Sequence, residues 1–386
     1  MKHFNNFEFS HATGGEAGKT ARFTPPAGSA RRSPGGDRIP TTSHDPHGPT
    51  RTVPLVSAVL LSYNCESLVA DAIRGILRQD YAGPMEIVAS DDASTDGTFA
   101  VLEAELTNAG ANHKVHLLRR VSNSGSKSAH LNDVFPRTAG DILISFDADD
   151  VAEPSRVSRI VDAFATSPSV QAVYSNFSQM DPAGRPLGRG FVPHPTGNSA
   201  DSRWFARVDA YAAGATLAVR WAVIKQFGPL APDINEDIVL PFRASLLGQC
   251  VYLDEPLVRV RRHAASLTAD HDRFASIAAY RSRMLLGIDR ARRNLQSRLA
   301  DLQRAEALMP ERFEDFAELR RIAEESVSHA EMTAGLLAPA LTARVSALWR
   351  LVRSGDYPEE TLQHAALALA PHAYLAYKRR SLGVRR

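Results

Sequence analysis

The stretch Val56–Tyr63 reads VSAVLLSY, a near-continuous apolar run with β-branched residues, and it decides the fold. Such a run predicts a strand that is buried on both faces, as in a parallel sheet. Short segments with helical spacing of apolar residues alternate with further runs of this kind. We expect the next strands at Met85–Ser90, Val115–Arg119 and Asp141–Phe146, and helices at 67–79, from about Thr98 to Leu106 and at Lys127–Arg137. The alternation predicts a doubly wound α/β sheet with ligands bound beyond the carboxyl ends of its strands.

Composition excludes several classes of protein. The 386 residues carry 45 Lys and Arg against 43 Asp and Glu, and a net charge of +2 is too small for a dedicated nucleic-acid binder. We therefore expect no nucleic-acid partner. Two cysteines, Cys65 and Cys250, cannot form a disulfide framework, and reduced thiols in a cytoplasmic protein are the simplest reading.

The chain divides into three parts by composition. Residues 1–52 are rich in Gly, Pro, Ser, Thr, His and Arg, and we expect them to be disordered because they bury too little apolar surface. Residues 53–268 hold the α/β pattern. Residues 269–386 are rich in Ala, Leu, Arg and Glu and predict a C-terminal α-helical extension, broken near Pro310, Pro339, Pro358 and Pro371. No segment offers the ~20 uninterrupted apolar residues of a transmembrane helix.

Polar residues lie where a site is expected, at the ends of three predicted strands. Tyr63 and Asn64 end the first strand, Asp91 and Asp92 the second, and Asp147 and Asp149 the fourth. In extended backbone, residues two apart point to the same side, so Asp147 and Asp149 could face one cation. Carboxylates with no Cys or His nearby in the sequence favour Mg²⁺ or Mn²⁺. A DxD triplet alone arises readily in an Asp-rich loop, but its place at a strand end strengthens the metal reading.

Two phosphate-binding motifs are excluded. A Rossmann dehydrogenase needs a Gly-rich turn after the first strand, where this chain has Ser62–Glu66, reading SYNCE. Gly14–Thr20 reads GGEAGKT, which ends like a P-loop but is one residue short and follows no strand.

Five motifs follow one another along residues 54–268. They are Val56–Asn64, the DDASTDGT block of Asp91–Thr98, Asn123–Gly125, Ala129 with Asn132, and FDADD at Phe146–Asp150. In the order and spacing of these motifs the chain resembles the family 2 glycosyltransferases, which have the GT-A fold. The resemblance implies a GT-A doubly wound mixed sheet and a nucleotide-diphosphate sugar as donor.

The resemblance also implies roles on the donor side. Tyr63 and Asp92 would hold the base, Asp147 would lie by the ribose and the metal, and Asp149 would ligate the metal that bridges the diphosphate. Lys127 would reach a phosphate or base, although a solvated lysine on a helix face fits the sequence equally well. His263, within RVRRHAASLT, would lie near the diphosphate or metal, with a solvated surface histidine as the alternative.

On the acceptor side, the resemblance implies that Gly214 lies in a loop that lines the acceptor site. The acidic pair Glu236-Asp237 would carry the catalytic base, and Asp237 is the position that matches. Such a carboxylate takes the proton of the acceptor hydroxyl, and attack from the face opposite the diphosphate inverts the anomeric configuration. Capping of the helix that starts there would favour acidic residues without any catalysis. Trp204 would pack in the core or form the acceptor wall.

Three functions remain open from the sequence. The leading one is an inverting, metal-dependent glycosyltransferase that moves a single sugar to a glycan or lipid-linked glycan acceptor in bacterial cell-surface polysaccharide biosynthesis. The others are a sugar-phosphate nucleotidyltransferase and a non-catalytic GT-A binding module. The last nine residues, KRRSLGVRR, carry five positive charges and suggest peripheral contact with an anionic membrane at the inner face of the cell membrane.

Overall fold

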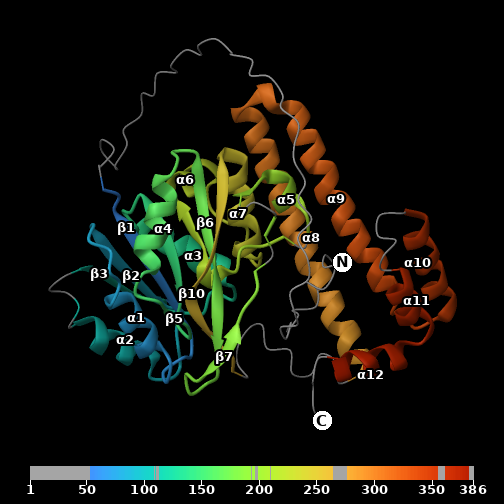
Figure 1. The fold of residues 1–386 in the computed structure, drawn as a ribbon, viewed down its shortest axis with the longest axis horizontal. Coiled ribbons are helices and arrows are strands. Elements are labelled where there is room, and N and C mark those ends of the chain that lie inside the picture. The colour runs from blue at the N-terminus through green and yellow to red at the C-terminus, as the bar shows by residue number, and fades with distance from the viewer. Residues whose placement is uncertain are drawn as a thin grey trace, which may run out of the picture.

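Residues 53–107, 109, 113–192, 194–195, 199–208, 210–263, 276–354 and 361–381 are described by the computed structural model. Their strands form one mixed sheet in the order β3-β2-β1-β4-β9-β6-β10-β5, with β7 paired to β6 and β8 to β10 (Figure 1). The strands are β1 (Val56–Ser62), β2 (Met85–Asp91), β3 (Lys114–Arg119), β4 (Ile142–Asp147), β5 (Val151–Ala152), β6 (Val170–Met180), β7 (Pro186–Arg189), β8 (Ser199–Ala200), β9 (Ala218–Arg220) and β10 (Gln249–Arg261). Residues 1–52 lie outside the described residues, and so do 264–268 and 382–386.

Helices cover both faces of this sheet. They are α1 (Val69–Leu77), α2 (Thr98–Thr107), α3 (Lys127–Val134), α4 (Arg156–Ala165), α5 (Ser202–Ala206), α6 (Trp221–Phe227), α7 (Glu236–Leu247), α8 (Ile277–Leu308), α9 (Phe313–Gly335), α10 (Leu341–Ser354), α11 (Thr361–Leu369) and α12 (Pro371–Ser381), with 3₁₀ turns at Phe135–Arg137, Gly214–Thr216 and Pro310–Arg312. One core cluster lies under α1, α2 and α4, and another lies under α3 and α5–α9. The expected mixed α/β sheet with a C-terminal helical extension is confirmed.

The register of the parallel strands brings the predicted site residues to one edge. β1 pairs in parallel with both β2 and β4, with Ser62 opposite Asp91 and Leu61 opposite Asp147. β1 is buried along almost its whole length, because its alternate residues pack into both core clusters. The convergence of polar strand ends that the sequence predicts is therefore present in the fold.

The sheet reverses direction beyond β4, and this reversal carries the end of β10 to the same edge. β9 is antiparallel to β4 and β6, β10 is parallel to β6, and β5 is antiparallel to β10. Arg259 lies opposite Val151, just after the Asp147–Asp150 turn. His263, two residues beyond β10, therefore comes back to that turn.

The C-terminal helices contribute to the main core. Leu302 and Ala305 of α8 and Phe316, Leu319 and Ala323 of α9 are buried in the cluster that also contains α7. Helices α10–α12 pack around a smaller cluster that includes Tyr280 and Met284 of α8. The helices break close to Pro310, Pro339 and Pro371, as the sequence indicates, while Pro358 lies outside the described residues. Among the described residues, none of the helices is long and apolar enough to cross a membrane.

Two local expectations need correction. Ser67 is the cap that the sequence predicts for the first helix, but α1 starts at Val69 after an N-cap at Leu68 that makes no side-chain capping bond. The predicted helix at 127–137 is an α-helix only to Val134 and continues as a 3₁₀ turn. Pro136 explains the change, because proline lacks the N–H that the α-helix needs at that position.

Candidate active site

Lys127 joins the two halves of the site. It starts α3, where the Ser126 side chain caps the helix by accepting from the Ala129 N–H. Its Nζ lies 2.7 Å from Asp147 Oδ1 and 2.9 Å from Glu236 Oε1. Burial lowers the pKa of Lys127, but the carboxylates of Asp147 and Glu236 outweigh this and hold the pKa well above its ordinary value. Lys127 is therefore an ion-paired ammonium within the site, and the alternative of a solvated surface lysine is wrong.

Asp237 is the least satisfied carboxylate at this edge. It lies in the first turn of α7, and its Oδ1 is buried with no hydrogen-bond partner among the described residues. Burial raises its pKa to about 7, the charges of Glu236 and Asp147 add to the rise, and Lys127 opposes it. A carboxylate whose pKa lies near neutrality is suited to general base catalysis.

Gly214 provides the space in which this cluster fits. A Cβ at this position would lie 2.8 Å from Glu236 Oε1, 3.3 Å from Lys127 Nζ and 3.6 Å from the Asp237 Cβ. The predicted acceptor-loop glycine therefore lies against both members of the acidic pair, and a side chain there would displace the Glu236 carboxylate.

A proline in α7 explains how the Gly214 loop is held. Pro241 lies inside the helix and has no N–H to donate to the carbonyl of Asp237 four residues earlier. That carbonyl instead accepts from the Ala212 N–H at 2.9 Å. Because Pro241 leaves the Asp237 carbonyl free, this carbonyl can hold the loop that contains Gly214 next to the residue predicted to be the base.

The DADD motif folds as a turn rather than as extended backbone. Asp147 ends β4, and the Asp150 N–H donates to the Asp147 carbonyl at 3.2 Å. The expectation that Asp147 and Asp149 project together from an extended segment is wrong. Asp147 faces Lys127, whereas Asp149 Oδ2 lies 3.0 Å from His263 Nε2. His263 is therefore beside the DxD motif and is not a solvated surface histidine.

The residues predicted to hold the base lie at the ends of β1 and β2. Tyr63 follows β1 with half of its surface exposed. The buried carboxylate of Asp92 accepts from the Ser124 N–H at 2.8 Å and from the Ser124 hydroxyl at 2.7 Å, and Arg120 Nε lies 3.1 Å away. Asp91 accepts from the Ser94 N–H and hydroxyl, which fixes the turn after β2. Contact of Tyr63 and Asp92 with a base stays a prediction.

Trp204 lies apart from the carboxylate cluster. It belongs to α5 and packs against the larger core, with the Arg207 guanidinium 5.8 Å from its ring centroid. This packing agrees with the core alternative, and a role in the acceptor wall is not tested by it.

Several groups around the site were not predicted from the sequence. Arg261 donates from its backbone N–H to Asp150 Oδ1, from Nε to the Asp149 carbonyl and from a terminal nitrogen to Asp71. Arg156 is buried below the turn and donates to the Ser145 carbonyl at 2.6 Å. Tyr211 has a pKa raised by burial and by the charge of Asp237. The sequence signal for Arg261 was its place in the RVRRH segment, while Arg156 and Tyr211 carried none.

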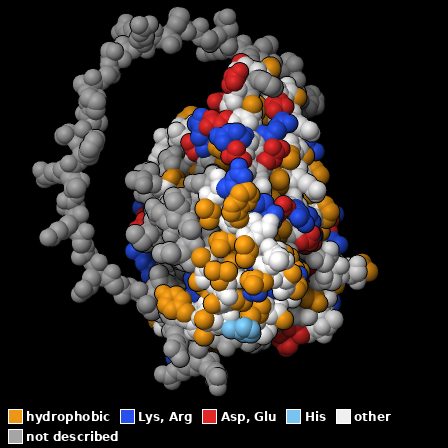
Figure 2. All heavy atoms as spheres, turned by 90° about the vertical axis from the view of Figure 1, so that its right-hand side faces the viewer, with side chains coloured by type: hydrophobic (Ala, Val, Ile, Leu, Met, Phe, Trp, Pro, Cys, Tyr) orange, Lys and Arg blue, Asp and Glu red, His pale blue; other side chains and the backbone are white. Residues whose placement is uncertain are grey.

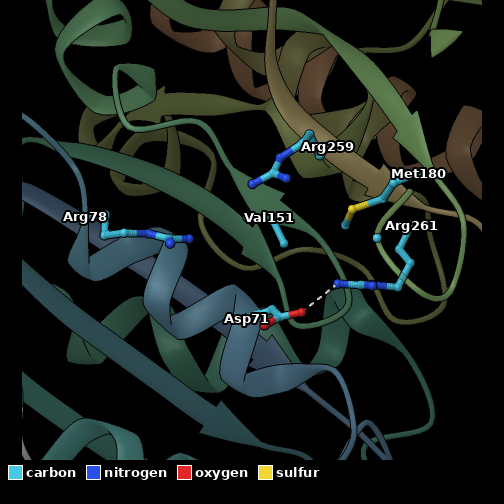
Figure 3. A pocket seen from close by; sticks show the side chains of 7 residues that line it. Asp71, Arg78, Val151, Met180, Arg259 and Arg261 are labelled. Carbon is cyan, nitrogen blue, oxygen red and sulfur yellow. Dashed lines mark hydrogen bonds and ion pairs between the residues drawn. The ribbon is translucent and has the colours of Figure 1, made fainter. Parts of the chain in front are cut away.

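A cavity of about 140 Å³ lies beside the predicted site rather than in it. Figure 3 shows Asp71 and Arg78 from the α1 side facing Arg259 and Arg261 of β10, with the Asp71–Arg261 ion pair at 3.0 Å. A second cavity of about 360 Å³ lies between α5, the end of α7 and α9. Neither cavity is lined by any of the predicted site residues.

The protein side chains at this site could bind a divalent cation only if the substrate supplied further ligands. The described residues contain no group of three or more His, Cys, Asp or Glu arranged to hold a metal. Asp149 and His263 offer one oxygen and one nitrogen 3.0 Å apart, which is about the spacing of adjacent ligands on an octahedral cation with bonds of ~2.1 Å. A diphosphate would have to complete such a shell.

Comparison with known proteins agrees with this architecture. Residues 57–220 match the model of glycosyl transferase family 2. The chain is 34% identical over 110 residues to EpsE of Bacillus subtilis, covering 28% of this chain and 37% of that protein. It is 26% identical over 226 residues to an uncharacterized glycosyltransferase of Nostoc, covering 55% of this chain and 66% of that protein. The expected family is confirmed.

A solved structure of similar fold is the mannosyltransferase PcManGT of Pyrobaculum calidifontis, determined in complex with GDP-Man and Mn²⁺. It is 22% identical, covers 84% of this chain and 85% of that one, and has a TM-score of 0.48. The matches to the first curated relatives span between 20% and 66% of the length of those proteins.

Proposed function

We propose that this chain is an inverting glycosyltransferase that moves a single sugar from a nucleotide-diphosphate sugar to a hydroxyl group. The acceptor is a glycan or lipid-linked glycan of a bacterial cell-surface polysaccharide. The observation that carries the proposal is Asp237, a carboxylate with a buried, unpartnered oxygen and a pKa near 7, next to the ion-paired Lys127 at the carboxyl edge of the sheet. The family match of residues 57–220 supports it.

In the proposed reaction Asp237 removes the proton of the acceptor hydroxyl. The acceptor oxygen then forms a bond to the anomeric carbon, while the bond from that carbon to the phosphate oxygen breaks and the nucleoside diphosphate leaves. Glu236 and Asp147 hold Lys127 in place, and Lys127 lowers the negative potential around Asp237. Gly214 leaves room for Glu236 and Lys127 to approach the loop that would line the acceptor site.

Asp149 and His263 would hold a divalent cation, with Asp147 close by. Such a cation would neutralise the negative charge that develops on the leaving diphosphate. An imidazole in the donor set favours Mn²⁺ over Mg²⁺, because Mg²⁺ takes oxygen ligands almost exclusively. Tyr63 and Asp92 would then contact the nucleotide base at the ends of β1 and β2.

The proposal is tested by ligand-dependent stability. Thermal unfolding is measured with UDP, GDP and dTDP, each with and without Mn²⁺, on the wild type and on Asp149→Ala. A ligand at 100 times its Kd adds ~2.7 kcal/mol, which shifts Tm by several degrees. We expect a Mn²⁺-dependent shift with one nucleotide that is lost in Asp149→Ala. No shift with any nucleotide would favour the non-catalytic binding module.

A second variant separates binding from chemistry. Asp237→Asn keeps the shape of the side chain but cannot accept the proton. We expect the nucleotide-dependent shift to remain, while transfer to an acceptor falls by about 10²–10⁴-fold. Retention of transfer in Asp237→Asn would exclude Asp237 as the base, and formation of a nucleotide sugar from a nucleoside triphosphate would indicate the nucleotidyltransferase instead. We place the reaction in the cytoplasm, at the inner face of the cell membrane.

A further inference from the structure

Helix α10 presents an apolar face to solvent. Leu341, Val345, Trp349 and Val352 recur at intervals of four, four and three residues, so they lie along one side of the helix. Their exposed fractions are 54%, 46%, 58% and 52%. The opposite side of the same helix is buried through Ala347 and Leu351. Helix α10 therefore has apolar residues on two sides, one packed in the core and the other exposed to solvent.

The neighbouring helices α11 and α12 also carry exposed apolar side chains. Leu369 at the end of α11 and Tyr377 in α12 are 59% and 66% exposed. Figure 2, which faces the side of the molecule where α10–α12 lie, shows hydrophobic side chains gathered over the surface with Lys and Arg among them. We call the set Leu341, Val345, Trp349, Val352, Leu369 and Tyr377 the C-terminal apolar face. An exposed apolar stripe such as that of α10 marks an interaction site.

The charges in the same helices have one sign. Residues 341–354 and 361–381 contain no Asp or Glu. Among their cations, Arg350 and Arg353 are exposed, whereas Lys378 is buried. The Arg353 guanidinium lies 4.5 Å from the centroid of the Trp349 ring, so a cation and the largest exposed apolar group are adjacent. Helix α9, by contrast, carries acidic residues such as Glu325 and Glu331 in ion pairs with arginines.

We propose that the C-terminal apolar face docks on an anionic lipid bilayer. Trp349 and the aliphatic residues would enter the boundary between headgroups and acyl chains, while the arginines pair with lipid phosphates. The basic charge of these helices selects this occupant, since cations near an anionic membrane surface are attracted to it. The inference does not depend on the proposed catalytic activity.

Sedimentation with lipid vesicles tests this proposal. The full chain is mixed with vesicles of phosphatidylcholine alone or with equal parts of phosphatidylglycerol, at about 0.1 M and about 0.5 M salt. We expect binding to the anionic vesicles that weakens with salt. The Trp349 fluorescence should shift to the blue on binding, and Trp349→Phe, which leaves two tryptophans, should lose that shift.

Substitutions on exposed positions keep the fold intact. Val345→Asp and Trp349→Asp should each weaken vesicle binding at least about tenfold. Leu187→Asp is the matched control, because Leu187 is also 58% exposed but lies in β7. The control should bind like the wild type, and all three variants should keep the wild-type Tm and any nucleotide-dependent shift.

Three outcomes would overturn the proposal. They are no binding to anionic vesicles, equal binding to neutral and anionic vesicles, and a concentration-dependent dimer in light scattering that Trp349→Asp abolishes while vesicle binding is unchanged. The last result would assign the face to a second copy of the chain. Because nucleotide binding is measured separately, failure of the catalytic proposal would leave these readouts interpretable.

Discussion

Lys127 Nζ lies 2.9 Å from Glu236 Oε1, and the same nitrogen lies 2.7 Å from Asp147 Oδ1. One ammonium therefore links the end of β4, on the donor side, with the first turn of α7, on the acceptor side. Without it, two carboxylates and the nearby Asp237 would face one another at short range. The contact makes the geometry of the proposed base dependent on a residue of α3.

Replacing Lys127 with Met should therefore loosen the site. The change leaves Asp147 and Glu236 without their counter-ion, and we expect a loss of about 1–3 kcal/mol in the free energy of unfolding. The proton affinity of Asp237 should rise further, since Lys127 lowers its pKa. Urea unfolding measures the first effect. Lys114→Met is the control, because that lysine is 66% exposed and 3.8 Å from Glu86; equal stability of the two variants would contradict the bridging role.

The raised pKa of Asp237 predicts how stability depends on pH. Its ordinary value is 3.8, and burial raises it to about 7 in the folded chain. Between these values the folded state binds more protons than the unfolded state, so this group makes the free energy of unfolding fall as pH rises. Asp237→Asn removes this pH-dependent contribution to the free energy of unfolding. Its Tm minus that of the wild type should therefore grow between about pH 4 and pH 7 and then level off.

Calorimetry across this range is the measurement, and Asp162→Asn is the matched control because its side chain is 70% exposed. The Tm difference of the control from the wild type should stay flat. A flat difference for Asp237→Asn as well would mean that Asp237 titrates near its ordinary value.

The location of the site was predictable because it follows from sheet register. Once VSAVLLSY, the Met85 strand and the DILISF run are parallel neighbours, Asp91 and Asp147 must lie at one edge. The role of Asp237 as the base could be predicted only from the family resemblance, since an acidic residue at the start of a helix is also explained by helix capping.

The pairing of charges was not predictable in the same way. Lys127 and Glu236 are more than a hundred residues apart, and no local pattern shows that they meet. The turn at Asp147–Asp150 also redirected Asp149 toward His263, which arrives from the far end of β10. Long-range topology, through the antiparallel β9 and the return of β10, fixed both contacts.

Gly214→Ala should damage the acidic pair directly. The added Cβ would lie 2.8 Å from Glu236 Oε1, closer than van der Waals contact allows, so Glu236 must move and Lys127 with it. We expect transfer to fall at least about tenfold, equivalent to about 1.4 kcal/mol in the barrier. Steady-state kinetics on Gly214→Ala, Glu236→Ala and the double variant measure the coupling. If the two losses simply add, the effect of Gly214→Ala does not act through Glu236.

Pro241→Ala tests the hydrogen bond that holds the Gly214 loop. The new N–H could donate to the Asp237 carbonyl, which now accepts from the Ala212 N–H at 2.9 Å. Alanine normally gains up to ~3 kcal/mol over proline inside a helix, and competition with Ala212 should reduce that gain while transfer slows. Pro371→Ala is the control, because Pro371 occupies the first position of α12, where proline is tolerated. The full gain in stability with an unchanged rate would show that the Ala212 contact is not needed.

The buried ion pair between Arg243 and Asp301 should be the strongest single link between α7 and the C-terminal helices. Arg243 Nε lies 2.8 Å from Asp301 Oδ2, and both side chains are at most 2% exposed. Asp301→Ala leaves a buried guanidinium that keeps the carbonyls of Gly228 and Pro229 and the ring of Phe227 but has no counter-ion, and we expect a loss of about 3–5 kcal/mol. Glu318→Ala breaks the exposed pair with Arg203 and should cost far less, because solvent screens that pair.

The same variant should also disturb the proposed site at a distance. Helix α8 holds the residue before α7, since the Asn235 N–H donates to Asn294 Oδ1 at 2.9 Å, and α7 begins at Glu236. Because Asp301→Ala should loosen the packing of α8, we expect this variant to transfer sugar more slowly than Glu318→Ala does. The difference should persist well below the Tm of either variant. Urea unfolding and steady-state rates at one low temperature check both parts. Wild-type stability of Asp301→Ala would mean that the packing of α8 on α7 rests on its apolar contacts alone, because the burial of Leu302 and Ala305 would then suffice.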